Sequence, residues 1–199
     1  MEKVLEEMQN YAKEKKICII LPETRVFLRE LCQKTKPKKI LEVGTAIGFS
    51  ASWMLRSCDA NITCSEASAP NIVLAKQNFE KLGLTQRVKI VYGDCLKTLP
   101  NFDEKFDLIF LDGPKGLYPE ILKLLLPLLD ENGTLVADNV SFRGMVTGEN
   151  QITEKRFEKT VKALTKFLDD LKNNSNLEVE VYEKLGDGVC TAKWRKKWI

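Results

Sequence analysis

The chain has 199 residues, of which 44% are hydrophobic and 30% are charged, and its formal net charge is +3. A chain of this length can bury a core without disulfide bonds or structural metals. No apolar run approaches the roughly 20 residues of a membrane span, and residues 1–16 lack the apolar stretch of a secretory signal. We therefore expect a cytoplasmic protein, and the mild positive charge permits nucleic-acid binding without arguing for it.

The chain contains six cysteines and no histidine. The cysteines are scattered without a C-x-x-C pair, which indicates reduced thiols rather than a disulfide framework or a zinc site. The lack of histidine excludes Ser-His-Asp and Cys-His nucleophiles and removes the commonest general base. Any acid–base chemistry must therefore use Lys, Asp, Glu, Tyr or Cys.

Helical spacing of apolar residues predicts two front helices, over residues 2–15 and 23–34. Short, continuous apolar runs then predict parallel strands covered on both faces. These runs are residues 39–44, 61–66, 88–93, 106–112 and 133–139. The amphipathic segments between them predict helices, at residues 48–57, 70–82, 94–99 and 116–129.

After Asn139 the sequence predicts a polar loop and a long helix at 152–173. Two further strand candidates, 177–185 and 188–194, are joined through a Gly186-Asp187-Gly188 turn. Alternating strands and helices imply right-handed crossovers and a doubly wound sheet. We therefore predict an α/β fold with a seven-stranded, Rossmann-like sheet, helices on both faces and a terminal antiparallel hairpin. The chain is expected to form one domain over 1–199, of which residues 1–36 are an N-terminal helical extension.

The segment from Gly44 to Gly48 follows the first predicted strand and opens a helix, where open α/β sheets bind nucleotide-like ligands. Gly44 allows the backbone to approach a ligand closely, and Ser50 lies at the helix N-terminus, where free N–H groups attract a carboxylate. The dinucleotide fingerprint G-x-G-x-x-G is absent. A tight turn without any ligand is the alternative interpretation.

Glu66 ends the second predicted strand, where a carboxylate can accept hydrogen bonds from both ribose hydroxyls of an adenosine. Such a residue would serve NAD or S-adenosylmethionine equally well. Asp94 and Cys95 follow the third strand, at a position where they could touch an adenine. A helix cap explains Asp94 equally well.

Asp112 ends the fourth predicted strand, and Asp138 and Asn139 end the fifth. Because the carboxyl ends of neighbouring parallel strands meet at one edge, three oxygen donors should converge there. Two carboxylates and an amide oxygen suit Mg²⁺, Mn²⁺ or Ca²⁺, with positions left for water and substrate oxygens. Turn or cap roles for both aspartates are the alternative.

Lys115 lies three residues after Asp112 and can act as the general base in a chain that has no histidine. A lysine that is partly desolvated beside a divalent cation is a candidate base for a substrate hydroxyl. The cation would lower the pKa of the same hydroxyl. Lys115 and the metal-binding Asp112 are therefore the catalytic candidates, and an exposed surface lysine is the alternative.

Taken in order, several segments of the chain resemble the metal-dependent O-methyltransferase family of catechol and caffeoyl-CoA methyltransferases. The segments are residues 40–50, 65–66, 93–94, 111–120 and 137–144, and the resemblance covers essentially the whole chain. It implies S-adenosylmethionine as cofactor, Lys115 as base, and a metal held by Asp112, Asp138 and Asn139. The cofactor contacts that we expect are Ile20, Gly44, Ser50, Glu66, Asp94, Cys95 and Asp112.

Within that family, residues 11–20, 37–50 and 138–144 are similar to the bacterial tRNA 5-hydroxyuridine methyltransferases. This likeness implies methylation at the wobble position of the tRNA anticodon loop, and the family implies a homodimer with the front helices as its interface. The 5-hydroxyl and O4 of 5-hydroxyuridine can chelate one metal as a catechol does. Gly113-Pro114 departs from the sequence pattern of the tRNA enzymes. The alternative to a tRNA acceptor is a small molecule of the catechol type.

Three features bear on an RNA acceptor. Arg143 lies just beyond the predicted metal ligands and is placed to meet a phosphate. The tail at 193–198 interleaves basic and aromatic residues, which suits phosphate contact and base stacking, although a solvated strand end explains it more simply. The segment 140–151 is too polar for an apolar lid, which favours a large acceptor.

Overall fold

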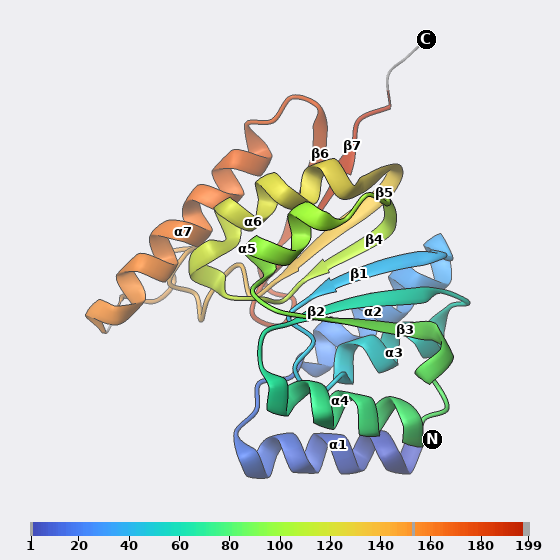
Figure 1. The fold of residues 1–199 in the computed structure, drawn as a ribbon. Coiled ribbons are helices and arrows are strands. Elements are labelled where there is room, and N and C mark those ends of the chain that lie inside the picture. The colour runs from blue at the N-terminus through green and yellow to red at the C-terminus, as the bar shows by residue number, and fades with distance from the viewer. Residues whose placement is uncertain (1, 153, 197–199) are drawn as a thin grey trace.

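The structure is a computed structural model that describes residues 2–152 and 154–196. The chain forms three layers, in which helices cover both faces of a central sheet (Figure 1). One face carries α1 (Glu2–Lys15), α2 (Pro22–Thr35), α3 (Phe49–Ser57) and α4 (Ala69–Lys81). The other face carries α5 (Cys95–Thr98), α6 (Tyr118–Leu125) and α7 (Lys155–Lys172).

The sheet has seven strands in the order β3-β2-β1-β4-β5-β7-β6. The strands are β1 (Lys39–Val43), β2 (Asn61–Glu66), β3 (Val88–Tyr92), β4 (Phe106–Leu111), β5 (Leu129–Asp138), β6 (Leu177–Tyr182) and β7 (Val189–Trp194). The first five pair in parallel, whereas β7 pairs antiparallel with both β5 and β6. The predicted α/β sheet with a terminal antiparallel hairpin is therefore confirmed.

Successive residues of the central strands point to opposite faces, and most of them are buried on either face. In β1, Ile40 packs toward the α1–α4 layer, whereas Leu41 and Val43 pack toward the α5–α7 layer. The same alternation in β4 sends Phe110 to the first layer and Leu111 to the second. Burial on both faces explains why these strands read as continuous apolar runs in the sequence.

Helices α1 and α2 contribute to the main core rather than standing apart from it. Leu5 and Met8 of α1 and Leu28 and Cys32 of α2 are buried in the same cluster as Ile40 of β1. The predicted 1–36 extension thus covers one face of the sheet. None of the helices in the described residues is long and apolar enough to cross a membrane.

Several predicted boundaries were wrong. The strand predicted over 133–139 begins at Leu129, and the helix predicted from residue 152 begins at Lys155. The leucine-rich segment predicted as one helix over 116–129 ends its α-helix at Leu125, because Pro127 has no N–H for the next helical bond, and β5 begins at Leu129. The strand predicted to reach residue 185 ends at Tyr182. There the N–H of Leu185 bonds to the Tyr182 carbonyl, so the chain turns before Gly186.

The direction of strand addition reverses between β1 and β4, which are neighbours in the sheet. From β1 the sheet grows outward through β2 to β3, and from β4 it grows the other way through β5. Open α/β sheets bind ligands at such a switch point, outside the carboxyl ends of the strands. The fold therefore points to the loops after β1, β2, β4 and β5 as the place to look for a site.

Candidate active site

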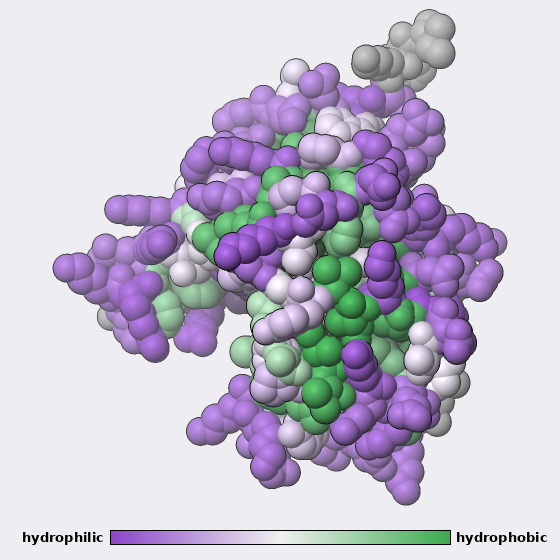
Figure 2. All heavy atoms as spheres, in the orientation of Figure 1, coloured by the Kyte–Doolittle hydropathy of each residue, from purple (hydrophilic) through white to green (hydrophobic). Residues whose placement is uncertain are grey.

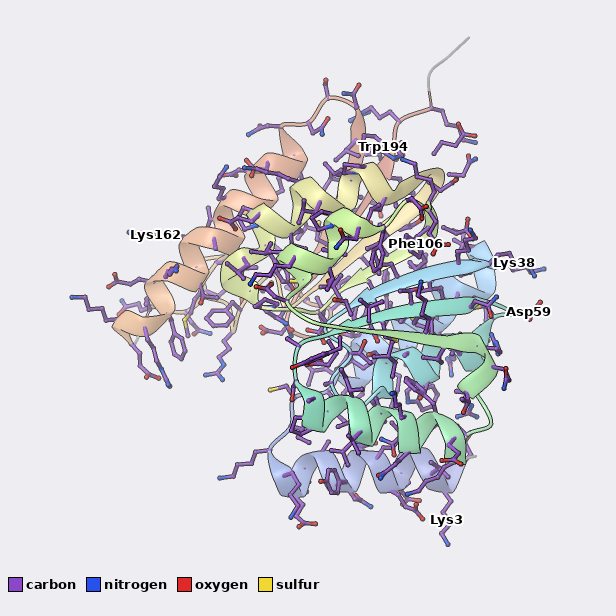
Figure 3. The ribbon with its side chains drawn as sticks, viewed as in Figure 1. Lys3, Lys38, Asp59, Phe106, Lys162 and Trp194 are labelled. Atoms are coloured by element: carbon purple, nitrogen blue, oxygen red, sulfur yellow. The ribbon has the colours of Figure 1, made fainter. Side chains whose placement is uncertain are left out.

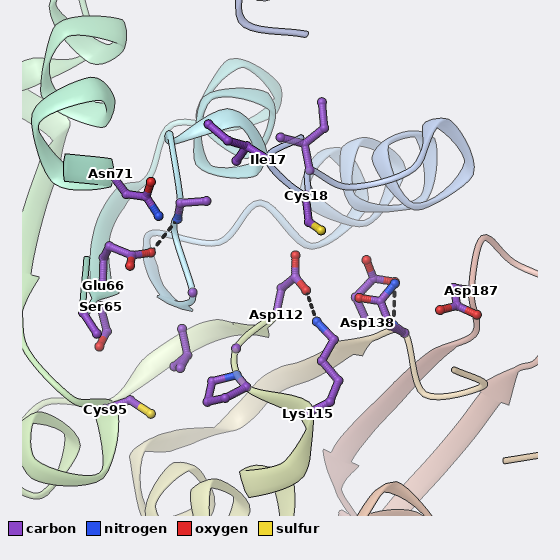
Figure 4. A pocket seen from close by; sticks show the side chains of 18 of the residues that line it. Ile17, Cys18, Ser65, Glu66, Asn71, Cys95, Asp112, Lys115, Asp138 and Asp187 are labelled. Atoms are coloured by element: carbon purple, nitrogen blue, oxygen red, sulfur yellow. Dashed lines mark hydrogen bonds and ion pairs between the residues drawn. The ribbon is translucent and has the colours of Figure 1, made fainter. Parts of the chain in front are cut away.

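A cavity of about 1240 Å³ opens at the carboxyl ends of the strands. Its walls come from the segment before α2, the loops after β1 to β5, and the connection between β6 and β7 (Figure 4). Figure 2 shows the surface hollowed between the part of the molecule that carries α7 and the part that carries α4. Sites for one small ligand span roughly 300–1000 Å³, so this cavity has room for two molecules side by side.

Gly44 brings the ends of β1 and β4 together at the base of the cavity. Its φ is +96°, and a Cβ added there would lie 2.3 Å from the Asp112 carbonyl oxygen. Both the backbone conformation and the close approach therefore require glycine. This contact fixes the position of Asp112 relative to the loop after β1.

Glu66, at the end of β2, has a carboxylate held by two backbone donors. Its Oε2 accepts from the Ala46 N–H at 2.7 Å and its Oε1 accepts from the Ser68 N–H at 2.8 Å. Each carboxylate oxygen keeps a further lone pair free for a ligand. The side chain lines the cavity, as an adenosine-binding residue must (Figure 4).

Asp94 and Cys95 also line the cavity. Asp94 is the N-cap of α5, because its side chain accepts from the Leu96 N–H at 3.0 Å. The cap anticipated from the sequence is thus present, and it leaves the residue on the cavity wall. Burial raises the pKa of the Cys95 thiol, which keeps that side chain neutral.

Asp112, Lys115 and Asp138 meet at the other side of the cavity (Figure 4). The Lys115 ammonium donates a hydrogen bond to Asp112 Oδ1, and both side chains are only one-fifth exposed. Asn139 lines the cavity beside them, with its backbone in the left-handed region at φ 57°. The structure thus brings the predicted base and the predicted metal ligands to one place.

Three contacts that the sequence did not suggest hold Asp138 and its strand. The buried Thr24 hydroxyl of α2 donates to Asp138 Oδ1 at 3.2 Å, and the Asn139 N–H donates to the same oxygen at 2.9 Å. The buried Tyr118 hydroxyl lies 3.1 Å from the carbonyl oxygens of both Leu111 and Asp138. Tyr118 therefore links the ends of β4 and β5.

The surroundings of Asp112 and Asp138 disfavour the ionised form of both carboxyl groups and raise their pKa. Burial, with a smaller contribution from the charge of Asp112, raises the pKa of Asp138 to about 6. Burial also raises the pKa of Asp112, although the Lys115 ammonium beside it acts in the opposite direction. When both carboxylates are ionised, one ammonium does not balance them.

The described residues contain no group of three or more His, Cys, Asp or Glu side chains arranged to hold a metal. The predicted set has only two carboxylates, and its third donor is the Asn139 amide. These hard oxygen donors and their uncompensated negative charge fit a divalent cation that keeps water or substrate oxygens in its shell. The donor chemistry of the cluster is therefore compatible with the expected metal.

Two residues predicted to contact the cofactor do not lie on the cavity wall. Ile20 is buried in the core, while its neighbours Cys18 and Ile19 line the cavity. The Ser50 hydroxyl lies in the interior and donates to Glu42 Oε1 at 2.5 Å. A role for either side chain therefore requires a rearrangement, and it stays a prediction.

Comparison with known proteins identifies the family of the chain. The family model described as O-methyltransferase matches residues 1–195. The chain belongs to the O-methyltransferase family. A Niastella koreensis protein named catechol O-methyltransferase is 31% identical, over 87% of this chain and 80% of its own length. The expected enzyme class, an S-adenosylmethionine-dependent O-methyltransferase, is thereby confirmed.

Solved structures agree with this assignment. A crystal structure from Staphylococcus aureus, 25% identical, superposes with a TM-score of 0.89 over 96% of this chain and 92% of its own. The SAH-bound methyltransferase of Podospora anserina is 27% identical, with a TM-score of 0.84 over 97% of this chain and 88% of its own. The fold of this O-methyltransferase is therefore shared along almost its whole length.

Replacing Thr24 by valine should lower activity or metal affinity by roughly 10- to 100-fold, because the Asp138 carboxylate loses a bond that orients it. Valine has nearly the same shape as threonine, so the packing of α2 should survive. The measurement is the Mg²⁺ concentration that gives half-maximal methyl transfer. Thr24→Ser, which keeps the hydroxyl, is the matched control, and equal losses in both variants would contradict the prediction.

Replacing Glu42 by glutamine should flatten the dependence of stability on pH. Glu42 is fully buried, and burial raises its pKa to about 7 against an ordinary value of 4.5. The folded state therefore binds this proton more tightly than the unfolded state, and stability falls as pH rises from about 4.5 through 7. Urea unfolding across that range measures the effect, with the exposed Glu30→Gln as control. An unchanged slope in Glu42→Gln would show that the carboxyl group ionises freely.

Proposed function

We propose that this protein transfers a methyl group from S-adenosylmethionine to a hydroxyl of a small aromatic acceptor that carries two neighbouring oxygens, with the help of a divalent cation. One observation carries the proposal: Lys115, the partly buried Asp112, the buried Asp138 and Asn139 converge on the cavity that Glu66 also lines. The relative from Niastella koreensis, named catechol O-methyltransferase, supports this class of acceptor.

The side of the cavity near β2 and β3 fits the cofactor. The Glu66 carboxylate is held by backbone donors in a position to accept bonds from ribose hydroxyls, and Asp94 and Cys95 lie close to where a base would sit. Asp112 lies at the junction of the two halves. The SAH bound to the Podospora anserina relative supports a cofactor of this kind.

The side near Lys115 fits the acceptor. A divalent cation held by Asp112, Asp138 and Asn139 would lower the pKa of the acceptor hydroxyl and fix the orientation of its two oxygens. In its neutral form, Lys115 Nζ can take the hydroxyl proton, and Asp112 Oδ1 then accepts a hydrogen bond from the ammonium that results. The chain thereby aligns the oxygen for in-line attack on the methyl group, and this positioning supplies much of the acceleration.

A second candidate acceptor is 5-hydroxyuridine at the tRNA wobble position, whose 5-hydroxyl and O4 offer the same pair of oxygens. Arg143 on the cavity wall favours it, because an arginine there can meet a phosphate. The C-terminal tail gives no support, since Trp194 lies at the end of β7 opposite the site (Figure 3). Lys197 and Trp198 lie outside the described residues. The named relatives favour the small-molecule acceptor.

The predicted homodimer and cytoplasmic location stay predictions. The expected dimer interface, the outer side of α1 and α2, carries the partly exposed apolar side chains Tyr11 and Val26. The mass of the protein in solution, measured by light scattering, tests the dimer directly.

The decisive experiment measures methyl transfer from labelled S-adenosylmethionine to catechol and, in parallel, to tRNA that bears 5-hydroxyuridine. EDTA controls test the metal. Label in catechol that is lost with EDTA supports the proposal, and label in tRNA alone moves the acceptor to RNA. Thermal stabilisation by NAD without any response to S-adenosylmethionine would refute the cofactor assignment.

A further inference from the structure

We infer that Arg143 is a specificity residue that binds an anionic group of the acceptor, so that the preferred substrate is an aromatic ring with two neighbouring oxygens and a carboxylate or phosphate beyond them. The inference rests on the proposed function and deepens it, because it adds a charge requirement to the acceptor class. It is carried by the position of Arg143, by the contacts that hold it, and by the charges that surround it.

Arg143 lines the same cavity as Lys115, Asp138 and Asn139, and its side chain is exposed to solvent. Its guanidinium lies over the Phe157 ring at the start of α7, 5.6 Å from the ring centroid. It forms no ion pair with any carboxylate among the described residues. The guanidinium is thus oriented by an aromatic face while its donors stay free for a ligand.

The backbone that presents Arg143 is strained and tightly held. Phe142 and Arg143 have φ of 44° and 59°, in the left-handed region that bulky side chains avoid. The Arg143 N–H donates to Asp187 Oδ1 at 2.5 Å, and Asn150 Nδ2 donates to the Arg143 carbonyl at 2.8 Å. Such strain persists only where surrounding contacts over-determine it, and it gathers at ligand-binding sites.

The loop is also anchored to the connection between β6 and β7. The N–H groups of Val140 and Ser141 donate to the carbonyls of Gly188 and Asp187, each at 3.0 Å. A Cβ on Gly188 would lie 2.1 Å from the Ser141 hydroxyl, so these two segments touch. The position of Arg143 is therefore built into the fold and does not depend on a bound ligand.

Among the described residues that line the acceptor side of the cavity, Arg143 is the cationic side chain that forms no ion pair. Lys115 is paired with Asp112, and Asp187 is engaged by the Arg143 backbone N–H. The remaining carboxyl group there, Asp138, belongs to the predicted metal cluster. A planar guanidinium binds carboxylate or phosphate with two parallel hydrogen bonds, which selects an acceptor with such a group.

The test compares kcat/KM for neutral catechol with that for 3,4-dihydroxybenzoate, and for 5-hydroxyuridine with that for its 5′-monophosphate, with Mg²⁺ present. These arms separate a carboxylate source from a phosphate source. The wild-type enzyme should prefer the anionic member of at least one pair by roughly 10- to 100-fold, the value of a hydrogen bond to a charged group. Arg143→Gln should lose that preference, because the substitution should lower kcat/KM for the anionic member far more than for the neutral one.

Arg156→Gln is the matched control, because Arg156 lies over the same Phe157 ring at 4.8 Å, pairs with Glu154 and does not line the cavity. It should keep the preference. Equal loss of rate with neutral and anionic acceptors in Arg143→Gln, or no preference in the wild type, would overturn the inference.

Equilibrium binding of the same acceptors to the enzyme with SAH and Mg²⁺ separates this inference from the proposed function. Tighter binding of the anionic members that disappears in Arg143→Gln supports the inference, even if no methyl transfer occurs and the proposed function fails. Methyl transfer to catechol without any dependence on acceptor charge leaves the proposed function intact and refutes the role of Arg143.

Discussion

Replacing Lys115 by alanine is expected to lower kcat by roughly 10²- to 10⁴-fold, the usual contribution of a general base. The side chain is mostly buried and meets Asp112 on the acceptor side of the cavity, and no histidine exists to replace it. The effect should fall on kcat rather than on cofactor binding, because Lys115 lies away from Glu66. Single-turnover methyl transfer and S-adenosylmethionine titration separate the two.

The exposed Lys123→Ala on α6 is the matched control and should behave as the wild type. Lys115→Ala should also melt at a lower temperature without metal, because Asp112 then loses its ion-pair partner and Asp138 loses a nearby positive charge. Added Mg²⁺ should recover that loss. A Lys115→Ala enzyme with wild-type kcat would remove Lys115 from the proton transfer.

The fold was predictable because its signals are local. The central strands are mostly apolar and buried on both faces, so runs such as residues 108–111 identify them. Residues that directly follow strands, such as Asp112 and Asn139, were also predictable, since the parallel arrangement sends all carboxyl ends to one edge. The order of strands then places these residues around one cavity.

The contacts that orient the site were not predictable, because they join positions that no local pattern connects. Thr24 reaches Asp138 across 114 positions of sequence. The Tyr118 hydroxyl links two strand ends from inside a helix that reads as ordinary core. Ser50 lies at the start of α3 as expected, but the hydroxyl that was predicted to contact the cofactor donates to the buried Glu42 instead. Only the packed structure shows these partners.

Replacing Asp138 by asparagine should have opposite effects on activity and on stability. Activity should fall by roughly a hundredfold or more, because the predicted metal cluster loses one of its two carboxylates. Without metal, however, the variant should be more stable than the wild type above pH 7. Asp138 is 1% exposed, and burial raises its pKa to about 6 from an ordinary value of 3.8.

The direction follows from proton binding. Because the folded-state pKa lies above the unfolded value, the folded protein binds this proton more tightly, and the stabilisation is complete only below about pH 3.8. It is lost as the pH rises through about 6, at a cost on the order of 2–3 kcal/mol. Asparagine is neutral at every pH and avoids that cost, so metal-free melting curves at pH 5 and pH 8 should show the variant gaining only at the higher pH.

Metal should reverse the ranking. A cation that Asp112 and Asp138 help to hold would stabilise only the folded state, so Mg²⁺ should raise the melting temperature of the wild type at pH 8 and have little effect on Asp138→Asn. The exposed Asp103→Asn is the control and should follow the wild type in both series. A variant that is destabilised at pH 8 without metal, or that responds to Mg²⁺ as fully as the wild type, would refute the assignment. If this ranking is observed, the fold alone disfavours the ionised forms of Asp112 and Asp138. A bound divalent cation would then balance their negative charge and stabilise both carboxylates.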